Sequence, residues 1–203
     1  MILEILKLSL YLTISLIGIY FVFGYIYQAI EKKSSYYLIK TFGLNGLLLT
    51  GIGTVVHEFS HYIMCKIFNH KIIEVKLFRP FEFKEDGMLG YVNYSYNRKS
   101  LYQRVGNFFS GIAPIIGGTI IIIVISILLF PSIYDNLNLS INISESKDIL
   151  KILVDNLEAF YNAIFNLDNI KDIKFWIFIY LVTSISIHMT LSKADLENAK
   201  EGV

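Results

Sequence analysis

Two histidines and a glutamate lie within an otherwise apolar stretch, TVVHEFSHYIM, at residues 54–64. His57, Glu58 and His61 form the pattern H-E-x-x-H. On a helix, side chains four residues apart lie one turn apart on the same face, so both imidazoles can bind one metal ion. Zinc is the expected ion, because neutral imidazole suits it and its catalytic sites combine three protein ligands with water. Glu58 would then lie beside the metal as a general base.

The third protein ligand must come from another part of the chain. Asp195, in LSKADLENAKEG, follows the last apolar stretch by a few residues, and the histidine pair lies a similar few residues from the end of its own stretch at Lys66. Asp195 is therefore the favoured third ligand, and His188 is the alternative. Ser192 and Asp195 also have the spacing of a capping box, so the carboxylate can cap a helix, alone or in addition to binding metal.

The only cysteine continues the histidine face but does not extend the site. Cys65 lies two turns beyond His57, about 12 Å along a helix axis, so it cannot share a metal with both histidines. We interpret it as a packing thiol. A single cysteine also excludes an internal disulfide and a multi-cysteine zinc cluster.

The composition places these ionisable residues in a membrane protein. Of the 203 residues, 54% are hydrophobic and 17% are charged, and the mean hydropathy is +0.54, which is too apolar for an ordinary soluble domain. Four stretches approach the roughly 20 apolar residues that a bilayer requires. They cover residues 8–30, 41–65, 105–130 and 175–191. Ionisable side chains within such a span are costly and usually functional, which favours the metal site.

The distribution of charge predicts the orientation of these spans. The connection after the second span is rich in lysine and arginine: Lys66, Lys71, Lys76, Arg79, Lys84, Arg98, Lys99 and Arg104. Basic connections remain on the cytoplasmic side, so we expect this connection and both termini to be cytoplasmic in a multi-pass protein of the cell membrane. The net charge of +1 argues against a nucleic-acid partner.

The sequence predicts an all-α membrane protein, a single polytopic domain over residues 1–203 with about four transmembrane helices. Alternating apolar residues and an Asp-Gly turn signal predict a small cytoplasmic β-hairpin at about 71–96, after the second span. Apolar residues at helical spacing predict an amphipathic helix at about 147–170, between the third and fourth spans.

Small and polar residues recur at every fourth position in two of the spans. The first series is Gly46, Thr50, Thr54 and Glu58, and the second is Gly106, Ser110, Pro114 and Gly118. Such stripes allow helices to approach closely in a membrane. We therefore expect the second and third spans to meet along these faces.

The combination of these features resembles the site-2 protease family of intramembrane metalloproteases. The resemblance rests on H-E-x-x-H within a span, on SGIAPIIGG in the next span and on a late aspartate. Ala113 and Pro114 resemble part of the family's Ala-Gly-Pro motif, and Asp195 resembles the aspartate that completes the family's zinc site. The family's asparagine after that motif is replaced near Gly117, and its Asn-Pro to Asp-Gly signature is absent.

The resemblance implies a minimal intramembrane zinc metalloprotease with one zinc ion per chain. His57, His61 and Asp195 would bind the zinc, and Glu58 would activate the zinc-bound water for hydrolysis of peptide bonds. The expected partners are the lipid bilayer and a membrane-spanning protein substrate, which must unwind before cleavage. A zinc transporter and an inactive scaffold that binds membrane helices are the alternative functions.

Overall fold

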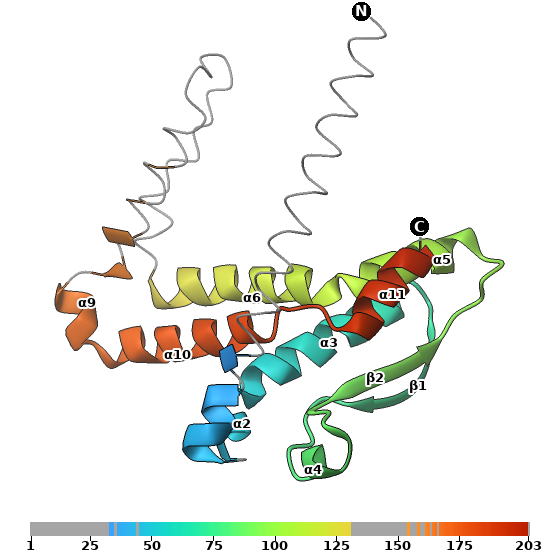
Figure 1. Cartoon of the computed structure of the whole chain (residues 1–203). Coiled ribbons are helices and arrows are strands. Elements are labelled where there is room, and N and C mark those ends of the chain that lie inside the picture. Colours follow the sequence, from blue (N-terminus) through green and yellow to red (C-terminus); the bar gives the residue numbers. More distant parts are fainter. Residues whose placement is uncertain are drawn as a thin grey trace, which may run out of the picture.

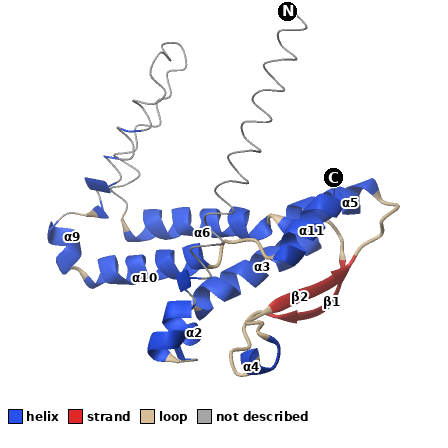
Figure 2. Ribbon diagram, in the orientation of Figure 1, coloured by secondary structure: helices blue, strands red, loops and turns tan. Residues whose placement is uncertain are grey.

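A computed structural model describes residues 33–34, 36–43, 45–130, 154, 158, 161–162, 164–165 and 167–202. Within these residues the fold is mostly helical with one antiparallel pair of strands, which confirms the predicted helical class and the small β element (Figure 2). The predicted first span at 8–30 lies outside the described residues. So does most of the predicted amphipathic helix at 147–170, the end of which overlaps α9 (Leu167–Lys171).

The predicted second span is not one continuous helix. A preceding helical segment ends at Gly43, whose φ of 63° lies in the left-handed region that favours glycine. The chain then forms α2 (Asn45–Leu49) and, after a break at Thr50, α3 (Gly51–Ile67). The metal-ligand pattern therefore lies in the middle of α3, because the helix begins later than predicted, whereas its end at Ile67 lies close to the predicted end of the span.

The predicted third span is also broken. Helices α5 (Leu101–Gly111) and α6 (Ala113–Leu129) meet at Ile112 with a bend of 60°. Pro114 explains the bend, because it has no N–H to donate to the Ser110 carbonyl four residues earlier. In the described part of the chain, no single helix is long and apolar enough to cross a bilayer, but α5 and α6 together pass that test by length and composition.

Three helices form the centre of the molecule. Helix α3 packs against α6 and α10 (Ile173–Ile187), and α6 and α10 run antiparallel beside each other (Figure 1). Helix α11 (Lys193–Gly202) packs on α5 at one end of this group. At the other end, Phe130, Ile164, Phe175 and Phe178 form an apolar cluster.

The β element lies along α3. Strands β1 (Lys71–Lys76) and β2 (Tyr91–Ser95) pair antiparallel, from Lys71 opposite Ser95 to Lys76 opposite Tyr91. The connection between them is longer than the predicted Asp-Gly turn and contains α4 (Phe83–Asp86), which ends at Gly87 with a φ of 73°. The chain enters β1 directly after α3 and therefore returns along the helix that carries the histidine pair (Figure 1).

Glycines bring the central helices into close contact, although not along the whole predicted stripes. A Cβ at Gly117 of α6 would overlap Ser60 of α3, and a Cβ at Gly53 of α3 would overlap the Ser184 carbonyl of α10. Gly118 faces Met189 and not α3, so the predicted contact of the two spans is only partly correct. The break at Ile112 changes which residues of the series share a face.

Candidate metal centre

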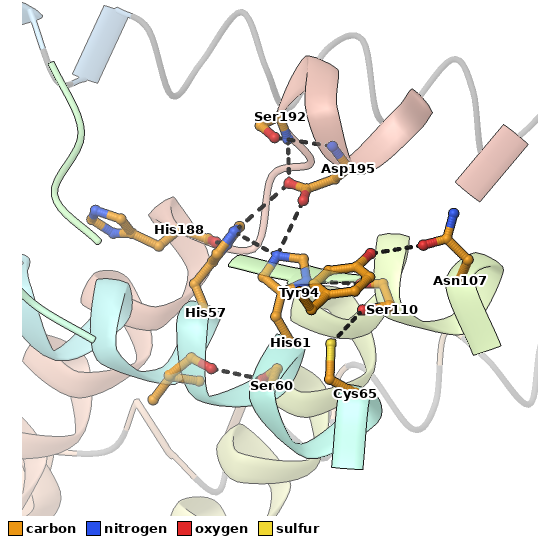
Figure 3. A network of polar contacts seen from close by, with 11 residues as sticks. His57, Ser60, His61, Cys65, Tyr94, Asn107, Ser110, His188, Ser192 and Asp195 are labelled. Carbon is orange, nitrogen blue, oxygen red and sulfur yellow. Dashed lines mark hydrogen bonds and ion pairs between the residues drawn. The ribbon is translucent and has the colours of Figure 1, made fainter. Parts of the chain in front are cut away.

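The two histidines of α3 and an aspartate from α11 converge on one point (Figure 3). The Nε2 atoms of His57 and His61 lie 3.1 Å apart. Asp195 approaches them with both carboxylate oxygens, Oδ1 at 3.2 Å from His61 Nε2 and Oδ2 at 3.7 Å from His57 Nε2. These residues are close enough to hold one metal ion, and no other group of this kind occurs in the described residues.

Backbone carbonyls orient both imidazoles. His57 Nδ1 lies 2.5 Å from the carbonyl of His188, the C-cap residue of α10. His61 Nδ1 lies 2.8 Å from the carbonyl of Ser110, the one that Pro114 cannot satisfy. Carbonyls can only accept, so we assign the protons to Nδ1, which leaves an Nε2 lone pair on each ring directed at the shared point. This is the usual arrangement of metal-binding histidines.

The donor set fits zinc. With both N–H groups donated to carbonyls, two imidazole lone pairs and a carboxylate face one another with their nearest atoms 3.1–3.7 Å apart, an arrangement that a bound cation stabilises. Ligand atoms about 2.0–2.1 Å from a tetrahedral zinc lie about 3.3 Å from one another. The observed separations of 3.1, 3.2 and 3.7 Å fall around that value.

The position of Asp195 is compatible with both of the roles that the sequence left open. Its N–H donates to Ser192 Oγ at 3.1 Å, and its Oδ2 accepts from the Ser192 N–H at 2.8 Å, which completes a capping box at the start of α11. Burial raises the pKa of this carboxyl, but the hydrogen bond and charge interactions with His61 and His57 outweigh burial and hold the pKa below its usual value. The carboxylate is therefore fixed in place and anionic, as a metal ligand requires.

His188 contributes its backbone and not its ring to this centre. Its Nδ1 lies 3.1 Å from the Ser184 carbonyl, and its ring points away from the histidine pair (Figure 3). The group of metal-binding side chains found among the described residues includes Asp195 and not His188.

Glu58 lies beside the centre on a cavity of about 960 Å³. It is 9% exposed, and Gly90 packs so closely that a Cβ there would lie 2.7 Å from Glu58 Cγ. The cavity is lined by the metal-binding residues, β2 and the segment from Thr190 to Asp195. The carboxylate is thus held by packing next to a space that can admit a substrate.

Comparison with known families bears on the same residues. Residues 51–148 match the family model described as "Putative zincin peptidase" (DUF3267). The match covers His57, Glu58 and His61, and it supports a zinc metallopeptidase-type family. No curated protein and no solved structure matches the chain. Asp195 lies outside the matched residues, so its assignment rests on its distances to His57 and His61.

Reasoning from the sequence missed the residues that support this centre. The sequence did not predict that the Ser110 and His188 carbonyls would orient the histidines. A proline four residues after Ser110 does indicate a carbonyl without its helical hydrogen bond. The hydrogen bond of 2.8 Å between Tyr94 and Asn107, drawn beside the centre in Figure 3, was also missed. No local pattern identifies this pair, because its members come from a strand and a helix.

Proposed function

We propose that this chain is an intramembrane zinc metalloprotease that hydrolyses peptide bonds of membrane-spanning substrates. The observation that carries the proposal is the convergence of His57 Nε2, His61 Nε2 and the Asp195 carboxylate beside Glu58. The match to a zincin-type peptidase family supports the hydrolytic part. The intramembrane part is supported by the distribution of polar and apolar side chains on the helices.

Helix α3 buries most of its polar side chains, Lys66 excepted, and exposes several of its large apolar ones. The buried set is Thr54, Glu58, Ser60 and His61, and the exposed set is Ile52, Phe59, Ile63 and Ile67. Helices of water-soluble proteins have the opposite arrangement, with the apolar stripe facing the core. An apolar outer face around a polar interior fits a helix surrounded by lipid.

Helices α6 and α10 support the same environment. Helix α6 is apolar on every face, a property of helices that are buried in a large core or in a membrane. Its exposed side chains include Ile120, Ile123, Val124, Ile127 and Leu128, and those of α10 include Ile173, Trp176, Ile177 and Tyr180. Many large apolar side chains exposed on neighbouring helices indicate contact with lipid or with another protein. We propose a multi-pass protein of the cell membrane with cytoplasmic termini, in line with the basic connection after α3.

The chain's own residues perform the proton transfers of the proposed reaction. Zinc, when bound, would lower the pKa of a water molecule and polarise the scissile carbonyl. A Glu58 carboxylate oxygen takes the proton from the attacking water and later gives it to the leaving amide nitrogen. The carbonyls of Ser110 and His188 keep both histidine rings in the orientation that the site needs.

The substrate segment must be extended, because the carbonyls of a helix are hydrogen-bonded and shielded from attack. Within the described residues, β2 pairs with β1 on one edge, and residues of β2 line the cavity of the metal centre. An unwound segment can add to the other edge of β2 as a third strand. Strand addition would hold its peptide bonds next to Glu58.

The test is a comparison of cleavage and zinc content in detergent-purified protein and in cells that co-express a membrane-spanning substrate. Glu58→Gln should retain one zinc per chain but lose cleavage on the order of a thousandfold or more, since the base and proton shuttle are removed. Glu197→Gln, on the exposed face of α11, is the matched control and should cleave normally. Wild-type cleavage by Glu58→Gln, or zinc transport into proteoliposomes by the wild type without any cleavage, would contradict the proposal.

A further inference from the structure

A buried asparagine connects β2 to α11. The Asn107 side chain, on α5, is completely buried. Its Oδ1 accepts a hydrogen bond from the Tyr94 hydroxyl at 2.8 Å, and its Nδ2 donates to the Asn198 carbonyl at 2.8 Å. A buried side-chain amide that loses its partners is costly, so both bonds constrain the elements they join.

Helix α11 is seated on α5 by close backbone contact on both sides of this amide. A Cβ at Gly111 would lie 2.6 Å from the Ala199 backbone nitrogen, and a Cβ at Gly202 would lie 2.7 Å from Phe108 Cα. The glycines allow the helices to touch but supply no directional bond between them. Asn107 supplies one, and it holds a carbonyl three residues after Asp195, about one turn along α11.

We propose that Asn107 is a positioning residue, which fixes α11 so that the Asp195 carboxylate stays opposite the two histidines. This inference rests on the proposed metal site. The same amide holds Tyr94 of β2, so the strand that lines the substrate cavity and the helix that carries the third ligand share one anchor. Neither Tyr94 nor Asn107 takes part in the chemistry in this proposal.

The test is zinc affinity, measured by competition with a chelator on the full-length protein in detergent. Asn107→Leu has a similar volume but neither donates nor accepts, and it should weaken zinc binding by about tenfold or more, in the range seen for residues that support metal ligands. The visible absorption spectrum of the cobalt-substituted variant should also change, because the position of one ligand changes. Ser126→Ala, a buried hydroxyl on α6 that bonds to its own helix, should change neither measurement.

Tyr94→Phe separates the two bonds of the amide. It removes the bond to β2 and leaves the bond to α11, so zinc affinity should stay within about twofold of the wild type. An equal loss of zinc affinity in Tyr94→Phe and Asn107→Leu would mean that Asn107 acts through its bond to β2 and not through its bond to α11, and it would overturn the proposal. If Asn107→Leu does not fold, Asn107→Ala takes its place.

Wild-type zinc affinity and cobalt spectrum in the folded asparagine variant would also overturn the inference. That result would leave the proposed function intact, provided that the wild type binds one zinc. Loss of the proposed function would instead appear as an absence of stoichiometric zinc in the wild-type protein itself.

Discussion

The two ends of the helical group are held together by different means. At the metal end, α3, α5 and α11 meet through glycines, backbone carbonyls and buried polar side chains. At the far end, α6 and α10 meet through aromatic rings, such as those of Phe130 and Phe178 at 5.2 Å in an edge-to-face arrangement. Aromatic packing stabilises the contact between helices without requiring one exact orientation of the side chains. The hydrogen bonds at the metal end do require one, because they depend on distance and direction.

The difference shows where a metal site in apolar helices can obtain its orienting groups. A continuous helix satisfies its own carbonyls, but a helix that ends or bends leaves some available. Both histidines use such carbonyls, His57 from the end of α10 and His61 from the bend between α5 and α6. The breaks that shorten the predicted spans therefore contribute directly to the site.

The largest expected effect is the loss of a histidine at the metal end. His61→Ala should abolish stoichiometric zinc binding, because structural zinc sites are worth about 10–16 kcal/mol and one ligand among three or four accounts for roughly 4 kcal/mol, or about a thousandfold in affinity. Zinc content of the purified protein measures this directly.

His70 provides the matched control for that change. It is also buried, at 5% exposure, and its Nε2 lies 2.9 Å from the Gln103 carbonyl, but it is not in the metal-binding group. His70→Ala should therefore lower stability and retain one zinc per chain. Equal loss of zinc in both variants would show that the metal end responds to any change in packing and not to ligation.

The next effect in size concerns the aromatic end. Phe178 is 3% exposed, and Phe178→Ala should lower the free energy of unfolding by roughly 3 kcal/mol through lost contacts and the cavity that remains. Zinc affinity of the folded variant should stay at the wild-type value, since Phe178 lies in the first half of α10, ten residues before His188. A thermal unfolding curve and a zinc titration on the same sample check both statements. A large fall in zinc affinity would show that the two ends are coupled.

The sequence predicted which residues meet at the site better than it predicted the shape of the helices. H-E-x-x-H places two histidines on one face of any helix, and Asp195 lies at a similar distance from the end of its apolar stretch as the histidines do from theirs. The structure brings His57, His61 and Asp195 together as these two observations predict. The helix breaks were not predicted, because each long apolar stretch was assumed to form one continuous helix. Pro114 was assigned to a packing stripe, although its missing N–H ends α5.

The supporting residues could not be predicted for a different reason. Asn107 and Tyr94 become partners only when β2 returns along α3 and α11 packs on α5, and no local spacing encodes that meeting. The capping box of Ser192 and Asp195 could be predicted from the sequence, because its two residues lie within one helical turn.

The smallest effects separate the two roles of Asp195. Asp195→Asn keeps an oxygen that can accept from the Ser192 N–H and so can still cap α11, but it removes the charge that binds zinc. It should weaken zinc binding by roughly 100-fold, or about 2.7 kcal/mol, with little loss of folded protein.

Ser192→Ala removes the acceptor of the Asp195 N–H, and it should cost about 1 kcal/mol of stability and change zinc affinity only a few-fold. Zinc titrations and unfolding curves of both variants decide the assignment. Full metal occupancy and normal activity in Asp195→Asn, together with a larger defect in Ser192→Ala, would reduce Asp195 to a cap and remove it from the proposed zinc site.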